Sequence, residues 1–402
     1  MTTSLFTPTV TIDGTDIASI VLTGATITRG KSDPDGDTTP ATAYLELVTA
    51  DADTTVATDL PLFSYGEGIE TGYRDEYRES YEGGETKIVA GTPVTVEVST
   101  PTGYVDEYAD TYTGYLGTRF AGIVTAIDYS PYLIALTAVD GSEALTRIMV
   151  DPSSWPVEDE TARAARIAAA AGITVDVVGT SGRNIIATDV EQSPRSSWAM
   201  LADLAESCDA LLYSTRDGVV TYRTRDAVVG HELVLVPPSA TITDDLTMTQ
   251  ELGRIVNRCT VEYGAAVDGV RPTVTVDDAS SIALYGVREG ATVITILDDV
   301  ADATAHANRV LDHYATVTWH MPSAVVNLHL AELDESVLTD GLQAIVDLDL
   351  DDDVELPTLL PAAPMGSYRS RVLGYTETVD RYAWQIALSM DPAGWTKQEE
   401  IA

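Results

Sequence analysis

The chain has 402 residues, a length that predicts about two or three domains at roughly 150 residues each. It carries 63 acidic and only 23 basic residues, for a formal net charge of -40, which excludes a protein that reads nucleic acid through its phosphates. The two cysteines, Cys208 and Cys259, lack metal-ligand spacing and are too few for a disulfide framework, so we expect both to be buried apolar residues. No apolar run approaches the roughly 20 residues of a membrane helix, and the N-terminus has no basic segment followed by an apolar stretch. We therefore expect a chain made in the cytoplasm, with no membrane span.

The first 150 residues are dominated by β-branched and apolar runs that turn residues separate. We expect these runs to form an antiparallel meander that closes as a β-sandwich or barrel. The predicted strands are residues 7–12, 17–22, 25–29, 41–48, 93–99, 119–129 and 133–138.

A tyrosine-rich repeat interrupts these strands at about residues 62–115. Residues 72–81 recur as residues 103–112, an offset of 31 residues. The tyrosines of each copy share one face of a strand, or one stripe of a helix; they are Tyr73, Tyr77 and Tyr81, then Tyr104, Tyr108 and Tyr112. Because tyrosine offers contact area with few rotamers and a polar tip, we predict a protein interface. The alternative is a hairpin extension in which the two copies pair with each other.

Residues 151–240 predict a small α/β domain. Residues 158–171 are rich in helix formers, begin with acidic residues and stop at Gly172. Residues 196–208 place Trp198 among apolar residues at helical spacing, so we expect this tryptophan in the core and not at a ligand site. Asp217 and Gly218 then turn a hairpin.

Residues 241–402 predict a second β domain with one helix, at about residues 299–314. The chain closes in a hairpin whose two strands alternate in polarity around a turn at residues 380–382. The predicted strands are residues 248–263, 324–331, 342–350, 372–379 and 384–390.

Two patterns look like metal sites but fit them poorly. His306, His313 and His320 recur every seven residues, which would align them on a continuous helix. Pro322 disfavours helix just before it, so we interpret the three as scattered surface histidines. The aspartates of residues 33–37 look like a calcium loop, but Tyr44 stands where an EF-hand needs a bidentate acid, so a solvated turn is the better interpretation.

No sequence motif indicates an active site. A Gly-x-Ser-x-Gly elbow, a His-Glu-x-x-His helix and a Gly-x-x-x-x-Gly-Lys loop are all missing from the sequence. We expect no catalytic residue, cofactor or bound metal. One alternative stays open, because in so acidic a chain two carboxylates could meet in space as a glycosidase pair.

Several short phrases of the sequence match those of a known family. The N-terminal ones are Thr-Ile-Asp-Gly-Thr-Asp-Ile at residues 11–17, Ile-Thr-Arg-Gly-Lys at 27–31 and Thr-Ala-Tyr-Leu-Glu-Leu at 42–47. The most specific internal match is Ser-Ile-Ala-Leu-Tyr-Gly-Val-Arg at residues 281–288, and the closing hairpin adds a further one. These phrases resemble the tail hub, or baseplate hub, family of minor tail proteins in long-tailed viruses of actinobacteria or haloarchaea. The resemblance covers most of the chain, except about residues 62–115.

The resemblance implies a structural virion protein and not an enzyme. The implied fold is mainly β with an α+β middle: two tube-like antiparallel β-sandwich or barrel domains, residues 1–150 and 241–402, joined by the small α/β domain at residues 151–240. Three chains would form a ring at the tail tip that adapts a six-fold tail tube to a three-fold tip and lines the DNA exit channel. The implied partners are further copies of the chain, a tail tube or distal tail protein, and a tip fibre, spike or tape-measure protein.

An acidic cluster near the C-terminus has two interpretations. Asp347, Asp349 and Asp351 alternate along a predicted strand, so one face would carry all three into the channel lumen or toward divalent cations. The alternative is the charged end of a strand. The acidity of the whole chain also has two interpretations. An acidic lumen would let DNA slide without sticking, whereas a salty or GC-rich host would favour Asp throughout its proteins.

Two other functions stay open. A distal tail or receptor-recognition protein would use the tyrosine repeat as a glycan platform. A secreted acidic polysaccharide hydrolase is the second alternative, and the sequence shows neither a leader nor a catalytic motif for it.

Overall fold

A computed structural model describes the chain in segments joined by parts that are left out of the description. The described residues are 7–12, 14–16, 22–31, 39–48, 90–99, 116–129, 133–189, 193–227, 232–234, 249–250, 252–317, 319–320, 323–327, 347–350, 352–356, 368–380 and 384–392.

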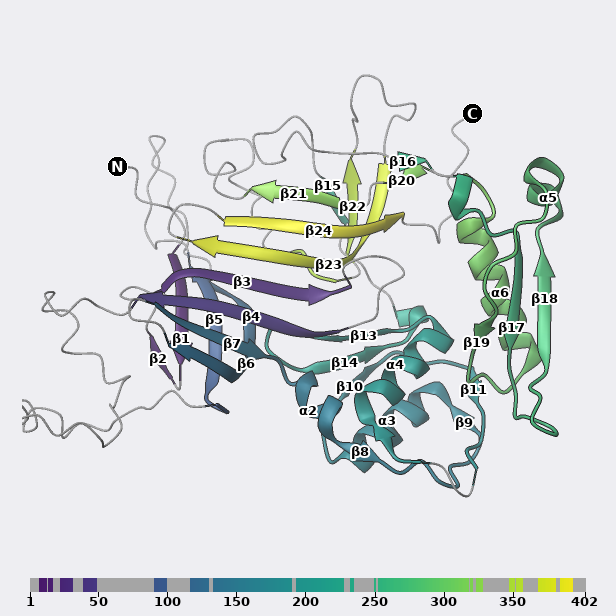
Figure 1. Ribbon diagram of the computed structural model, residues 1–402, viewed down its shortest axis with the longest axis horizontal. Helices are drawn as coiled ribbons and strands as arrows, with labels where there is room; N and C mark the ends of the chain where they lie inside the picture. Colours follow the sequence, from purple (N-terminus) through teal and green to yellow (C-terminus); the bar gives the residue numbers. More distant parts are fainter. Residues whose placement is uncertain are drawn as a thin grey trace, which may run out of the picture.

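A mostly antiparallel sheet of twelve strands forms the body of the protein (Figure 1). Its N-terminal strands pair in the order β3-β4-β7-β6-β5-β1-β2, which curls β1 and β5 back over β3 and β4 as a half-barrel. These strands are β1 (Thr7–Ile12), β2 (Thr15–Asp16), β3 (Leu22–Gly30), β4 (Thr39–Val48), β5 (Pro93–Ser99), β6 (Leu116–Tyr129) and β7 (Leu133–Val139). Most carry alternating β-branched residues, which predict strands with one buried face.

The C-terminal strands join the same sheet. β23 pairs antiparallel with β3 from Gly374 opposite Gly30 to Asp380 opposite Gly24. The order therefore runs on through β22 to β15 on one side, and β24 with β21 branches from β23. These strands are β15 (Glu232–Val234), β21 (Ser323–Asn327), β22 (Asp353–Leu356), β23 (Tyr368–Asp380) and β24 (Trp384–Pro392). The two terminal parts of the chain thus share one sheet, and the division into domains at residues 150 and 240 stays a prediction.

Two glycines allow β3 and β23 to approach closely. A Cβ built on Gly30 would lie 2.3 Å from the backbone oxygen of Leu373, and one on Gly374 would lie 2.3 Å from that of Lys31. Gly30 also has a positive φ of 74°, which side chains with a Cβ rarely adopt. Both positions therefore require glycine.

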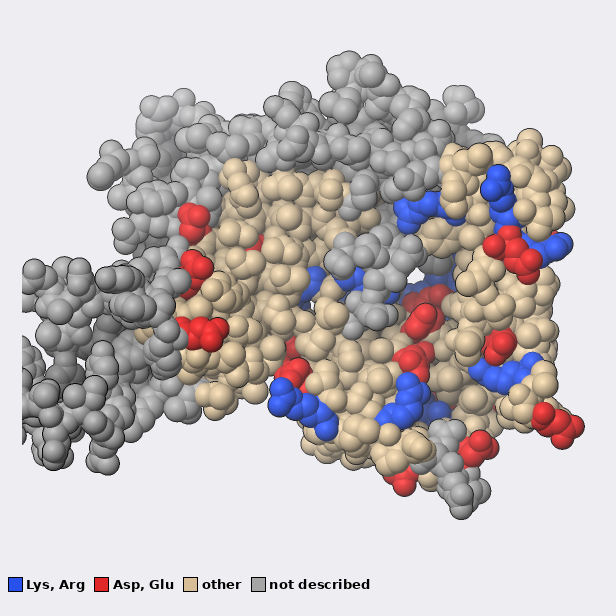
Figure 2. All heavy atoms as spheres, in the orientation of Figure 1, with Lys and Arg blue, Asp and Glu red and all other residues tan. Residues whose placement is uncertain are grey.

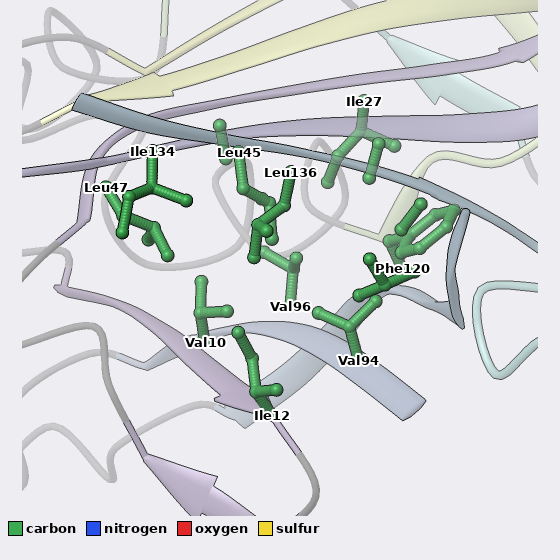
Figure 3. Packing of buried hydrophobic residues seen from close by; sticks show 14 of the residues in the cluster. Val10, Ile12, Ile27, Leu45, Leu47, Val94, Val96, Phe120, Ile134 and Leu136 are labelled. Carbon is green, nitrogen blue, oxygen red and sulfur yellow. The ribbon is translucent and has the colours of Figure 1, made fainter. Parts of the chain in front are cut away.

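The core of the half-barrel lies between β1 and β5 on one side and β3, β4 and β7 on the other (Figure 3). Cross-strand partners point into it together, since Ala25, Leu45 and Leu136 occupy one row and are all at most 1% exposed. Burial of such a row stabilises the fold by roughly 25 cal/mol for each Å² of apolar surface removed from water.

A small α/β unit follows, at residues 142–227, and lies beneath the sheet in Figure 1. The two predicted helices are present as α3 and α4, whereas α2 was not predicted. Asp159 and Ser196 cap the N-termini of α3 and α4, and Gly172 ends α3 in the left-handed conformation. Its helices and strands are α2 (Ser142–Arg147), β8 (Met149–Val150), β9 (Glu158–Asp159), α3 (Glu160–Ala171), β10 (Asp176–Val178), β11 (Asn184–Ile185), β12 (Arg195–Ser196), α4 (Ser197–Cys208), β13 (Leu211–Ser214), β14 (Val220–Arg223) and η3 (Arg225–Ala227). Trp198 and Cys208 are buried in its core, as predicted.

A second small unit, residues 252–317, lies at the right-hand side of Figure 1. A three-stranded sheet in the order β18-β17-β19 packs its apolar face, which includes Cys259 and Val261, against α6. The elements are η4 (Leu252–Arg254), β17 (Arg258–Glu262), β18 (Thr273–Asp277), α5 (Ala279–Tyr285), β19 (Val293–Ile294) and α6 (Val300–Tyr314); the two-strand pair β16 (Thr249–Gln250) and β20 (Trp319–His320) flanks it in sequence. The helix predicted at 299–314 is confirmed, whereas β18, β19 and α5 were not predicted.

Two predicted strands are wrong in part of their length. The one predicted at 248–263 is interrupted by η4 (Leu252–Arg254), and β17 begins only at Arg258. The one predicted at 342–350 is wrong in the part that the structure describes. Residues 347–350 form a turn, and the next strand begins only at Asp353. The aspartates cause this, because Asp349 N donates to Asp352 Oδ2 at 2.7 Å and Leu350 N donates to Asp349 Oδ1 at 2.9 Å. Such local side-chain bonds compete with the sheet ladder for backbone N–H groups.

The described helices are all too short or too polar to cross a membrane.

Candidate functional site

A fully buried ion pair lies inside the large sheet. Arg119 of β6 donates from Nε to both oxygens of Glu377 at 2.9 Å and from Nη2 to Oε2 at 2.8 Å, and both side chains are 0% exposed. Trp384 of β24 donates its indole N–H to Glu377 Oε1 at 2.7 Å. Glu377 therefore ties a strand from the N-terminal part of the sheet to two strands from the C-terminal part.

A second buried arginine joins the sheet to the small α/β unit. Arg29 of β3 donates from Nη1 to Asp349 Oδ1 at 3.0 Å and to Tyr375 Oη at 2.8 Å, and Nη2 donates to the carbonyl oxygen of Ser214 in β13. Arg216 reaches the same tyrosine, with 3.3 Å between its Nε and Tyr375 Oη.

Electrostatics keep this joint charged. Burial acts to lower the pKa of Arg29, but Tyr375 and Asp349 outweigh it and hold that pKa above its ordinary value. The same balance, with Tyr375 and Asp349 again opposing burial, raises the pKa of Arg216. The joint thus brings together four separate stretches of the chain, at Arg29, residues 214–216, Asp349 and Tyr375.

A third ionic joint connects the two small units. Asp209, which ends α4 with a left-handed φ of 52°, lies 3.3 Å from His306 Nδ1 and 3.8 Å from Arg225 Nη1, and it also pairs with Arg309. Burial acts to raise the pKa of the Asp209 carboxyl, but the hydrogen bond and charge of His306 and the charges of Arg309 and Arg225 outweigh it, so the pKa is lowered.

Backbone pairing reinforces this third joint. Ile186 N donates to the oxygen of Ile296 at 2.9 Å, and Asp298 N donates to that of Asn184 at 2.8 Å. Between them Ile185 and Leu297 form an antiparallel bridge and are both 0% exposed. The two units therefore meet through a short piece of sheet as well as through charge.

The outward face of the large sheet carries two rows of uncharged side chains across β21, β24, β23, β3 and β4. Register places each row's members opposite one another, and all are exposed or half-buried. The first row is Val325, Ala387, Thr376, Thr28 and Thr42; the second is Asn327, Gln385, Thr378, Thr26 and Tyr44. We call these ten residues the hydroxyl face, since half of them are threonines and one is tyrosine.

Acids return where the strands end. The next row along the strands holds Asp380 opposite Gly24, and Gly24 opposite Glu46. Figure 2 shows a tan area over β24, β23 and β3 with few charged residues, and Asp and Glu gathered at its left-hand edge.

The structure describes two of the three acids of the predicted row, and it places them before the start of β22. Asp347 is exposed in the turn before β22, Asp349 accepts from the buried Arg29, and Asp351 lies outside the described residues. Because residues 347–350 are not a strand, alternation does not place them on one face. That these acids line a lumen stays a prediction. The six tyrosines at 73, 77, 81, 104, 108 and 112, and the aspartates of 33–37, also lie outside the described residues.

The prediction of surface histidines is wrong for two of the three. His306 and His313 are 4% and 9% exposed, because their spacing of seven puts both on the buried side of α6. His320 lies beyond the end of α6, in β20, so the three do not share a helix. Within the described part of the chain, no three His, Cys, Asp or Glu side chains are grouped to hold a metal ion.

The buried charges were not predicted from the sequence. Arg29 and Glu377 occupy the same alternating positions as the buried Ile27 and Val379 of their strands. A charged residue in phase with the apolar positions of a strand was therefore the available signal, and it predicts a buried partner of opposite charge.

No family model matches the chain, and no curated protein matches its sequence. Among solved structures, the fold is similar to that of a tail protein from Neisseria meningitidis, with a TM-score of 0.60 and 10% identity over 97% of each chain. The 43 kDa tail protein of prophage MuSo2 from Shewanella oneidensis gives a TM-score of 0.57 and 13% identity over 96% of this chain and 98% of that one. A prophage tail protein from Listeria monocytogenes gives 0.51 and 9% over 96% and 95%.

Each likeness covers nearly all of this chain and nearly all of the other protein. The sequence identities are too low to show a common function. What the likenesses show is the arrangement of the elements. The chain therefore has the fold of these phage tail proteins along nearly its whole length.

Proposed function

We propose that this protein is a structural component of a phage-like tail, and specifically the tail hub subunit at the tail tip. The observation that carries the proposal is the end-to-end likeness in fold to a tail protein, 97% of each chain at a TM-score of 0.60. Two further solved structures with this fold are also tail proteins. The phrases at residues 11–17 and 281–288 favour the hub among tail components.

The large sheet supports a ring in which each chain contributes two modules. Its N-terminal part curls as a half-barrel from β1 to β7, and its C-terminal part is built from β15 and β21 to β24. Three chains would then present six such parts, which adapts a six-fold tube to a three-fold tip.

The buried ionic joints suit a part that transmits load. Arg119 with Glu377, Arg29 with Asp349, and Asp209 with its basic neighbours each connect stretches of chain far apart in sequence. Buried pairs of this kind hold one geometry, because any other arrangement leaves a charge without its partner.

The proposed partners are other tail components, and the proposed location is the virion's tail tip. Further copies of this chain would complete the ring, with a tail tube or distal tail protein above and a fibre, spike or tape-measure protein below. Contacts would use sheet edges and aromatic patches, including the tyrosine repeat. The proposal assigns the chain no catalytic activity, cofactor or metal.

Electron-microscopic class averages of the purified protein, alone and with neighbouring tail proteins, test the proposal. Three-fold rings with an open channel are expected. Monomers under both conditions would reject the hub, and binding of those monomers to host cell-wall sugars would favour a receptor-recognition protein.

A further inference from the structure

The hydroxyl face has a composition that folding alone does not require. The chain carries 63 acidic residues, yet all ten positions of the face are uncharged, and none is lysine or arginine either. Exposed strand positions accept charged side chains readily in soluble proteins. We therefore expect the neutrality of this face to reflect the molecule that it contacts.

A protein partner is one candidate, since interfaces exclude charge from their centres. Such centres are also rich in tyrosine, tryptophan, phenylalanine, methionine and arginine, and poor in alanine and serine. The hydroxyl face holds a single aromatic residue, Tyr44, and otherwise threonines, two amides, one alanine and one valine. Its hydroxyl and amide groups retain water, and it offers no tryptophan, phenylalanine, methionine or arginine anchor.

A passing polyanion is the second candidate, and it explains the lack of both signs. A basic residue would hold each phosphate and make movement dependent on breaking ion pairs. An acidic residue close to the phosphates would raise a barrier to entry, because like charges in a confined space repel strongly. Neutral hydroxyls do neither, and they keep a layer of water over which the cargo moves.

We infer that the hydroxyl face lines the conduit and that duplex nucleic acid in transit is what it meets. This inference rests on the proposed hub function and names the wall of its channel. It replaces an acidic wall with a neutral one, and Asp380 and Glu46 then stand at one rim of that wall.

Cysteine accessibility in the assembled ring tests the inference. The native thiols give little background, since Cys208 and Cys259 are at most 1% exposed and burial raises the pKa of both. Thr28→Cys and Thr378→Cys place one thiol each on exposed positions of the face. Thr273→Cys is the matched control, since Thr273 is an exposed threonine on β18 of the three-stranded sheet β18-β17-β19.

Each variant is treated with a small methanethiosulfonate and with a maleimide carried on a polymer too large to enter a channel. In ring particles, Thr28→Cys and Thr378→Cys should react with the small reagent and lose reaction with the polymer, whereas Thr273→Cys should react with both. In dissociated chains all three should react with both reagents.

Three results would overturn the inference, and they differ in what else they remove. Protection from both reagents in intact rings would make the face an interface between proteins and leave the hub in place. Reaction with both reagents in intact rings would put the face on the outside. Failure to form rings at all would remove the hub and the conduit together.

Discussion

The two faces of the large sheet distribute charge in opposite ways. On the buried face, Arg29, Arg119 and Glu377 are at most 2% exposed. On the outward face, the ten residues that span β21, β24, β23, β3 and β4 include no charge. Soluble proteins generally do the reverse, with charges kept in water and neutral residues kept inside.

This difference distinguishes residues that stabilise the fold from residues that contact something outside it. The buried charges serve the fold, because each has a partner that fixes how distant parts of the chain meet. The neutral outward residues are exposed or half-buried, so we expect their selection to reflect what they contact. Substitutions that remove a buried charge, or add a charge to the outward face, test whether the two kinds of residue have these different roles.

The largest effect is expected from breaking the Arg119–Glu377 pair. Glu377→Gln keeps the shape and an acceptor for Trp384, but removes the counter-charge that Glu377 supplies to the buried guanidinium of Arg119. We expect a loss of about 3 to 5 kcal/mol in the free energy of unfolding, measured by chemical denaturation.

A double variant separates the loss of the pair from the burial of one charge. Arg119→Met with Glu377→Gln removes both charges and should recover much of the stability that Glu377→Gln loses. Equal stability of the single and double variants would show that the lost counter-charge of Arg119 is not the cause.

The Arg29 joint should give a smaller effect. Asp349 is 31% exposed, so water can hydrate it once the arginine is removed, and Tyr375 keeps Arg216 as a neighbour. We expect Arg29→Met to lower the free energy of unfolding by about 2 to 3 kcal/mol. A limited-proteolysis pattern with new cleavage near Ser214 would show that the α/β unit has loosened from the sheet, whereas an unchanged pattern and stability would contradict the joint.

The Asp209 joint should give a smaller, pH-dependent effect. Asp209→Asn keeps a residue that tolerates the left-handed φ but removes the charge. We expect a loss of about 1 to 2 kcal/mol near neutral pH. Thermal unfolding of the wild type and the variant across pH measures it.

The sign of the pH dependence follows from the lowered pKa of Asp209. Its stabilisation is fully present above the ordinary carboxyl value of 3.8 and is lost as the pH falls through the lower folded value. The difference in melting temperature between the wild type and Asp209→Asn should therefore shrink below about pH 4. A difference that stays constant into acid would mean that the charge of Asp209 contributes nothing.

Much of the fold could be predicted because its signals are local. β1 and β5 match the predicted runs at both ends, and α3 and α4 begin directly after Asp159 and Ser196, whose side chains supply visible capping signals. The turn at residues 347–350 was missed, because alternation alone does not show that aspartates will bond to their own backbone.

The ionic joints and the hydroxyl face could not be predicted from local patterns. Arg29 meets Asp349 across 320 residues, and Thr28 lies opposite Thr376 only because β23 pairs with β3. Sequence alternation says that each threonine points outward but not which strands stand beside it. The register of the shared sheet is therefore the information that the structure adds.

The smallest effect is expected from adding a charge to the hydroxyl face. Thr28→Glu changes an exposed side chain on β3, and Thr28→Gln is its matched neutral control with nearly the same shape and strand propensity. Because water covers this position in the free chain, we expect the two variants to differ by less than about 0.5 kcal/mol in the free energy of unfolding. A larger penalty for glutamate alone would mean that the fold itself excludes charge here, and the neutrality of the face would then need no partner to explain it. Equal stability would mean that folding does not exclude charge here. The neutrality of the face would then reflect its function, as the proposed conduit wall requires.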